Sequence, residues 1–193
     1  MNKGILIVFS GVSGVGKGTI LSQLMPMEEL NLAYSVSMTT RKPREGEVEG
    51  VNYFFVSKDR FKQAIKDGEL LEHARFVNND YGTPKKYVEE MLEKGKNVIL
   101  EIEIRGAKQI MEKCPDALSI FIVPPSLEEL ERRLKERSSE DEQTIMKRIA
   151  KARRELKDID FYEHVVCNDD LDVAVKEVRK IILAEIKKRS KKK

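Results

Sequence analysis

Apolar residues in this chain gather into four short runs that are nearly continuous rather than alternating. The runs are Ile5–Phe9, Val98–Ile104, Leu118–Val123 and Val165–Cys167. Continuous runs of this length are typical of strands whose two faces are both covered by helices. Stretches with helical character separate the runs. The pattern therefore predicts an α/β fold with a parallel sheet flanked by helices.

Local capping signals give approximate limits for three of the helices. Thr83-Pro84 predicts a helix start, because a hydroxyl can cap the first turn and proline fits its first position. Gly95 predicts the end of that helix. Ser126–Glu129 has the pattern of a capping box that opens the second helix. Asp172 is expected to cap a final helix that runs to about Lys188.

Two regions interrupt the alternation of strands and helices. Residues 35–82 combine short β-like pieces, at Val36–Thr39 and Tyr53–Val56, with a helix near Lys58–Lys66. Residues 127–157 are strongly charged and rich in arginine. We interpret the first region as an inserted mixed α/β binding subdomain and the second as a mobile helical lid. The core of this single domain is then formed by residues 1–34, 83–126 and 158–190.

Composition and charge narrow the class of protein. The 193 residues are 40% hydrophobic and 36% charged, which allows one sizeable core. No apolar run approaches the ~20 residues that a membrane span needs, and no secretory signal is expected, so we expect a cytoplasmic protein. Six basic groups lie in the last seven residues, and without them the net charge changes from +3 to −3. Neither a nucleic acid nor a membrane is therefore an expected partner. The two cysteines and two histidines lack metal-ligand spacing, so no metal site made of side chains is expected.

A glycine-rich segment after the first apolar run has the pattern of a phosphate-binding loop. It matches G-x-x-x-x-G-K between a predicted strand and a predicted helix. Glycines let backbone N–H groups surround phosphate oxygens, and the next helix presents the positive end of its dipole. The lysine adds a full positive charge. We expect a nucleoside triphosphate to be held by Gly11, Val12, Ser13, Gly14, Val15, Gly16, Lys17, Gly18 and Thr19.

The loop departs from the usual pattern at Gly18, where a serine or threonine normally coordinates Mg²⁺. The nearest hydroxyl lies one residue later, at Thr19. We therefore expect Mg²⁺ to be held mainly by phosphate groups and water, which suits its reluctance to lose its hydration shell. The loop alone does not distinguish a kinase from a GTPase, an ATPase or a transporter domain.

A second anion-binding pattern follows the loop. Arg41 and Arg44 lie three residues apart beside several hydroxyls, and Pro43 stiffens the chain between them. Planar guanidinium groups suit bidentate phosphate binding. This segment, SVSMTTRKPREGEVEGVNYFFVS, and the later ELLEHARFVNNDYGTP resemble the acceptor-binding region of guanylate kinases. The resemblance covers nearly the whole chain, including the phosphate loop, VILEIEIRGAKQI, IFIVPPSLEELERRLKER and VVCNDDLDVAV.

The resemblance implies transfer of the γ-phosphoryl group of ATP, bound with Mg²⁺, to GMP in purine nucleotide metabolism. It implies that the GMP phosphate contacts Ser37, Arg41, Arg44, Tyr53 and Tyr81. It implies guanine contacts for Glu72, Thr83 and one acid of Glu101 and Glu103. Which acid contacts guanine stays open, because the family usually has aspartate where this chain has Glu103. A carboxylate can accept from N1–H and the 2-amino group of guanine, whereas adenine presents a lone pair at N1. Glu72 is therefore expected to reject AMP.

Arginines are concentrated in the predicted lid. Phosphoryl transfer brings several negative charges together, so arginines that arrive on closure can stabilise the reaction. The resemblance implies that Arg137 and Arg148 reach the ATP phosphates, and it places Asn168 near the adenine. The residues implied to be catalytic are Lys17, Arg44, Arg137 and Arg148. Arg132, Arg153 and Arg154 are expected on a solvated helical face with ion pairs such as Glu129–Arg133.

Two other functions stay open at this point. Lys17-Gly18-Thr19 also looks like adenylate kinases, so another nucleoside-monophosphate kinase is an alternative, although Glu72 and the Arg41–Tyr53 run argue against it. The second alternative is a non-catalytic guanylate-kinase-like module that binds phosphopeptides. That module would be expected to have a degraded phosphate loop, whereas this loop is intact. The oligomeric state is not predicted.

Overall fold

The computed structural model describes residues 3–76, 78–137 and 142–191. These residues form two compact units. Unit 1 consists of residues 3–8 and 32–117, and unit 2 of residues 9–31 and 118–191. The first strand, β1 (Leu6–Gly11), is divided between them. Within the described ranges, no helix combines the length and the apolar character that a bilayer crossing requires. The expected cytoplasmic location stays a prediction.

Unit 1 contains a parallel strand pair beside the start of β1. Strand β7 (Asn97–Glu101) pairs in parallel with β2 (Leu32–Tyr34). The Asn97 side chain accepts from the Ile5 N–H at 3.0 Å, and the Val98 N–H donates to the Ile5 carbonyl at 2.8 Å. Helix α3 (Lys85–Glu93) packs on β7, and α4 (Ile104–Lys113) follows it. Residues 98–100 are buried, as their continuous apolar run predicts, and the polar Asn97 before them is buried as well.

A second sheet of unit 1 has the strand order β4-β3-β6-β5. Its strands are β3 (Met38–Thr39), β4 (Phe54–Phe55), β5 (Leu70–Phe76) and β6 (Asn79–Pro84). Strand β3 pairs in parallel with β4 and antiparallel with β6, which pairs antiparallel with β5. Helix α2 (Lys58–Lys66) has the predicted limits, and the Ser57 side chain caps it. Its Phe61 and Ala64 pack with Met38 and Leu70 in a small core.

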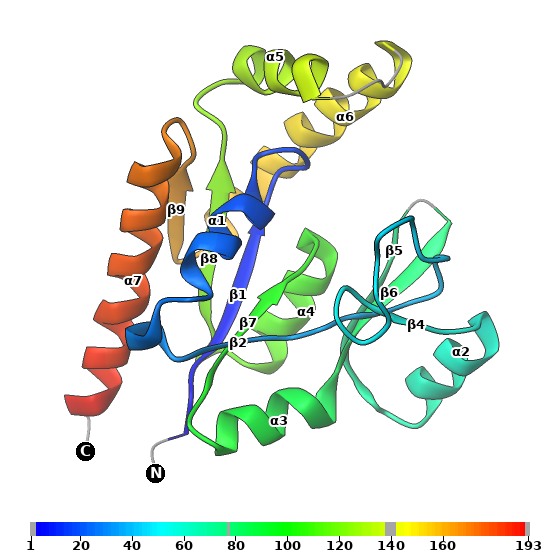
Figure 1. The fold of residues 1–193 in the computed structure, drawn as a ribbon, viewed down its shortest axis with the longest axis vertical. Helices are drawn as coiled ribbons and strands as arrows, with labels where there is room; N and C mark the ends of the chain where they lie inside the picture. Colours follow the sequence, from blue (N-terminus) through cyan, green and yellow to red (C-terminus); the bar gives the residue numbers. More distant parts are fainter. Residues whose placement is uncertain (1–2, 77, 138–141, 192–193) are drawn as a thin grey trace. The chain divides into compact units, whose positions relative to one another are not determined.

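Unit 2 contains the other parallel pair, in which β8 (Leu118–Val123) lies beside β9 (His164–Cys167). Helix α7 (Leu171–Lys191) packs against both strands and against α1 (Lys17–Leu24), as Figure 1 shows. Helices α5 (Leu127–Arg137) and α6 (Glu142–Glu155) pack on each other. Two short 3₁₀ helices, η1 (Glu28–Leu30) and η2 (Leu156–Phe161), complete this unit. The parallel pairs flanked by helices confirm the predicted α/β class.

Two of the predicted helix caps are wrong. Thr83 belongs to β6, and the N-cap of α3 is Pro84, which makes no side-chain capping bond. The Asp172 position already lies inside α7, and Asp170 accepts from the Val173 N–H at 2.9 Å instead. A capping side chain must stand before the first helical residue, where the backbone is still extended. The capping role of Ser126 is confirmed, since its Oγ accepts from the Glu129 N–H at 3.0 Å.

Candidate active site

The phosphate loop of unit 2 runs from the end of β1 to the start of α1. Gly14 and Gly16 have φ angles of 86° and 95°, in the left-handed region that favours glycine. Backbone of this kind can turn successive N–H groups toward one anion. The Lys17 ammonium donates to the Gly11 carbonyl at 2.9 Å and the Val12 carbonyl at 3.2 Å. The loop therefore has the geometry of an anion-binding nest with a cation attached to it.

Side chains from much later in the chain hold this loop. Asn168 Nδ2 donates to the Val15 carbonyl at 2.7 Å, and Glu155 Oε2 accepts from the Ser13 N–H at 3.1 Å. Glu155 is buried at the end of α6 and is also paired with Lys151 at 3.1 Å. Two buried polar side chains thus fix the loop backbone from outside it.

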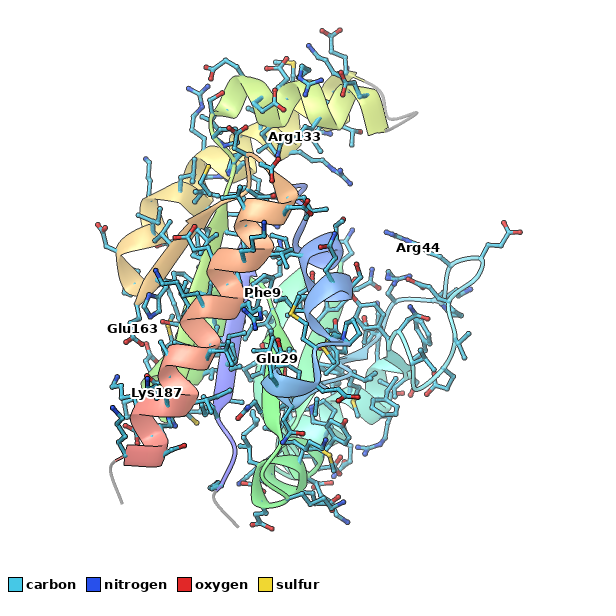
Figure 2. The ribbon with its side chains drawn as sticks, turned by 60° about the vertical axis from the view of Figure 1, so that its left-hand side comes forward. Phe9, Glu29, Arg44, Arg133, Glu163 and Lys187 are labelled. Atoms are coloured by element: carbon cyan, nitrogen blue, oxygen red, sulfur yellow. The ribbon has the colours of Figure 1, made fainter. Side chains whose placement is uncertain are left out.

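A cavity of about 240 Å³ lies beside the loop in unit 2. Its lining consists of Gly14, Val15, Gly16, Thr19, Arg133, Glu136, Asn168, Asp169 and Leu171. Arg133, labelled on α5 in Figure 2, donates to the Asn168 carbonyl at 2.6 Å and the Asp169 carbonyl at 3.1 Å. The expected Glu129–Arg133 ion pair is confirmed at 2.7 Å.

The oxygen donors of the cavity are compatible with a hard cation. The lining residues with oxygen-bearing side chains include Thr19, Glu136 and Asp169, of which Glu136 pairs with Arg132 and Asp169 with Arg133. In the described part of the chain, no group of three or more histidine, cysteine or acidic side chains could hold a metal ion. The residues present therefore fit Mg²⁺ that arrives with a triphosphate and keeps much of its water shell.

In unit 1, one carboxylate connects the two arginines of the second anion-binding pattern. Arg41 NH1 and NH2 donate to the Glu47 carboxylate at 2.9 and 2.8 Å, and the Arg44 N–H donates to it at 2.7 Å. The hydrogen bonds from Arg41 lower the pKa of Glu47 to about 2. Arg44 is exposed on the loop between β3 and β4, as Figure 2 shows. Glu47 therefore holds the Arg41 guanidinium in one orientation.

Aromatic rings surround the Arg41 guanidinium. Its central carbon lies 5.3 Å from the centre of the Tyr53 ring, and the Tyr53 and Tyr81 ring centres are 5.9 Å apart. The structure thus brings together Arg41, Tyr53 and Tyr81, three of the five residues predicted to bind the GMP phosphate. Ser37, four residues before Arg41 in the sequence, is half-buried, and its carbonyl accepts from the Phe54 N–H at 2.9 Å.

Glu72 is a buried acid on β5, and the residue is only 3% exposed. The Thr83 hydroxyl donates to its Oε1 at 2.7 Å. Burial raises the pKa of Glu72 to about 7, although the Thr83 hydrogen bond acts in the opposite direction. A buried carboxylate that is fixed by a hydrogen bond and has a pKa near neutral pH is typical of a functional site.

The two acids that compete for a guanine contact lie in different surroundings. Glu101 ends β7, is half-buried and accepts from the Tyr34 hydroxyl at 3.3 Å. Burial raises the pKa of Tyr34 further above its ordinary value. Glu103 is exposed at the N-cap position of α4.

Two of the predicted catalytic residues belong to the helices of the predicted lid, α5 and α6. Arg148 is half-buried on α6. Arg137 is the last residue of α5, and its side chain lies outside the described part of the structure, as do residues 138–141 of the predicted lid.

Sequence reasoning missed two residues that support the predicted ones, Glu47 and Glu155. Glu47 could have been suspected, because it lies three residues after Arg44 in a segment that was already singled out. Glu155 gave no signal, since it lies in a helix crowded with charges.

The comparisons with known proteins agree with the resemblance seen in the sequence. Residues 3–185 match the family model described as guanylate kinase. A guanylate kinase from Oceanobacillus iheyensis is 51% identical over 98% of this chain and 91% of its own length. One from Clostridioides difficile is 50% identical over 99% of this chain and 93% of its own length. The crystal structure of a guanylate kinase from Anaplasma phagocytophilum has a TM-score of 0.78 and 34% identity, over 95% of this chain and 87% of that one. This chain therefore belongs to the guanylate kinase family.

Proposed function

We propose that this protein is a guanylate kinase, which transfers the γ-phosphoryl group of ATP to GMP and gives ADP and GDP. The observation that carries the proposal is the buried Glu72 carboxylate, held by Thr83 in a chain that also has an intact phosphate loop. The Glu72 carboxylate selects a purine that has hydrogen-bond donors on its edge, and the phosphate loop binds phosphates. The relatives with about 50% identity over nearly the full chain support the same activity.

ATP is bound by the phosphate loop in this proposal. Backbone N–H groups of residues 11–19 surround the phosphates, and Lys17 adds its charge to the positive end of α1. Asn168 borders the adenine. Arg137 and Arg148 supply further positive charge when the lid closes. Mg²⁺ bound with ATP would neutralise phosphate charge and would be held mainly by phosphate groups and water, with Thr19 as the nearest hydroxyl that the loop offers.

GMP is bound by unit 1. Arg41, in the orientation that Glu47 imposes, binds the phosphate together with Ser37, Arg44, Tyr53 and Tyr81. The ionised Glu72 accepts from N1–H and the 2-amino group of guanine, with contributions from Thr83 and one acid of Glu101 and Glu103. The attacking oxygen belongs to a phosphate that is already ionised, so the reaction needs no protein base. Catalysis then consists of positioning and charge stabilisation, with Arg44 also steadying the transferred group.

In this proposal, different segments of the chain have different roles. Residues 35–82 form the GMP-binding subdomain, residues 127–157 form the lid, and the remaining core carries the phosphate loop. The enzyme acts in the cytoplasm.

A coupled assay of ADP release tests the proposal. The purified protein would be supplied with ATP and Mg²⁺ and with GMP, dGMP, AMP or UMP in turn. We expect turnover with GMP and rejection of AMP by about 10⁴-fold, because a dry carboxylate facing the adenine N1 lone pair has no partner. Chelation of the metal should stop the reaction, and added Mg²⁺ should restore it. Preference for AMP would indicate another nucleoside-monophosphate kinase, and no turnover with any acceptor would indicate a non-catalytic module.

A further inference from the structure

Gly106 occupies a position where a glycine is not required by the backbone. It lies in the first turn of α4, is buried, and has no positive φ angle. Glycine is among the poorest helix formers, and alanine is the best. The backbone at this position would therefore accept alanine, and the reason for glycine has to lie in the space around it.

That space is filled by the side chain of Glu72. A Cβ atom added at Gly106 would lie 2.2 Å from Glu72 Oε2, 2.8 Å from its Cδ and 3.4 Å from its Cγ. Outside the neighbouring residues and the backbone of α4 itself, these are the three nearest heavy atoms to the added carbon, and all belong to Glu72. Such a contact with Oε2 is impossible without a shift. The missing side chain of Gly106 thus makes the room in which the carboxylate lies.

Helix α4 cannot easily move away to relieve that contact. The Lys113 ammonium donates to the Leu71 carbonyl at 2.7 Å, and Gln109 Nε2 donates to the His73 carbonyl at 2.8 Å. Leu71 and His73 are the two neighbours of Glu72 on β5, so the helix is attached to the strand on both sides of the acid. The far end of the Glu72 side chain is the part that can rotate.

We propose that Gly106 is a specificity-determining positioning residue, which keeps open the space that holds the Glu72 carboxylate in place to recognise guanine. Thr83 holds Oε1 from one side, and Gly106 allows Oε2 to approach the first turn of α4. Unpaired N–H groups give that turn a partial positive charge, which favours a carboxylate. The inference rests on the proposed function of Glu72. It predicts a change that leaves the fold intact but displaces the group that recognises the base.

The test is the kinetics of Gly106→Ala with GMP and with IMP, which lacks the 2-amino group. We expect the KM for GMP to rise at least about tenfold and the preference for GMP over IMP to fall, because the carboxylate loses its position. The KM for ATP should stay within about twofold, and the unfolding temperature should be preserved, because alanine favours the helix. Glu112→Ala, an exposed change on the same helix, is the control and should leave all these values unchanged.

A second variant keeps the test informative if the single change disturbs folding. Glu72→Asp withdraws the carboxylate by one methylene group, so Gly106→Ala should cost less than about twofold in GMP affinity when it is added to that variant. An equal loss in both backgrounds, a normal KM for GMP in Gly106→Ala, or an equal rise in the KM for ATP would overturn the inference. The unmodified enzyme is assayed first, so a failure to phosphorylate GMP at all would refute the proposed function instead.

Discussion

Replacement of Glu72 by glutamine should make the protein more stable above pH 7 while it impairs GMP binding. In the native protein, burial raises the pKa of this carboxyl from its ordinary value of 4.5 to about 7. Between these two values the folded protein keeps a proton that the unfolded chain has released. The free energy of unfolding therefore falls as the pH rises. The stabilising contribution of the protonated acid is complete below pH 4.5 and is lost as the pH passes about 7.

The size of the effect follows from the change in pKa. A rise of about 2.5 pKa units corresponds to roughly 3 kcal/mol, at about 1.36 kcal/mol for each unit. Glutamine has nearly the same shape, can still accept from the Thr83 hydroxyl, and has no charge to bury. Relative to native protein, Glu72→Gln should thus gain about 3 kcal/mol between pH 4.5 and pH 8.5. For a chain of this length, the gain corresponds to a rise of roughly 6–12 °C in unfolding temperature.

Urea unfolding of both proteins at pH 4.5 and pH 8.5 measures this gain, with the exposed Glu112→Gln as a control. Calorimetry should show that Glu72→Gln loses at least about tenfold in GMP affinity but little in ATP affinity, because only the acceptor base meets this residue. A stability difference that is the same at both pH values would refute the buried-acid reasoning. Equal losses of GMP and ATP affinity would show that Glu72 is structural.

Three further substitutions, one of them with a control variant, test the rest of the site by steady-state kinetics. Lys17→Ala should lower turnover at least about 10²-fold, as the loss of a preorganised charge does, and near-normal turnover would contradict the phosphate-loop assignment. Glu155→Ala should raise the KM for ATP about tenfold, because it removes the acceptor of the Ser13 N–H in the loop. Lys151→Met, which removes only the ion-pair partner of Glu155, should change this KM little, and equal effects of the two substitutions would refute the role of Glu155 in holding the loop. Glu47→Ala should raise the KM for GMP about tenfold but not that for ATP, because Arg41 loses its bidentate partner, and an unchanged KM for GMP would show that Glu47 does not position Arg41.

The backbone conformation of the phosphate loop could be predicted from the sequence because its geometry is local. Glycines at fixed spacing after a buried strand permit the left-handed angles that Gly14 and Gly16 adopt. The cap at Ser126 was predicted for the same reason, since a cap depends on contacts within one turn, and the limits of the helix Lys58–Lys66 also agree with the prediction. The strands β1, β7 and β8 followed from continuous apolar runs, which indicate burial on both faces. Strand β2 was not among the predicted runs, and only Val166 is buried in β9.

Long-range pairing decided the positions where local signals failed. Thr83 has the local signature of a helix cap, but the β6 strand extends through it, and Pro84 pairs with Leu70 across the sheet. The Thr83 hydroxyl therefore donates to Glu72 and does not cap a helix. A partner on another strand outweighs a local propensity, because propensities amount to a fraction of the free energy gained by packing.

The supports of the site were decided only by the tertiary structure. Glu155 lies 142 residues from Ser13, and Asn168 lies 153 residues from Val15, so no spacing in the sequence connects either pair. The reason for Gly106 is the space that the Glu72 carboxylate occupies, which exists only when α4 is attached to β5 beside that residue. The sequence by itself predicted which groups would bind phosphate and base, because the binding chemistry of such groups belongs to the residue types themselves. The packing of distant elements determined which backbone and side-chain atoms hold them in position, because that depends on space and contact rather than on residue type.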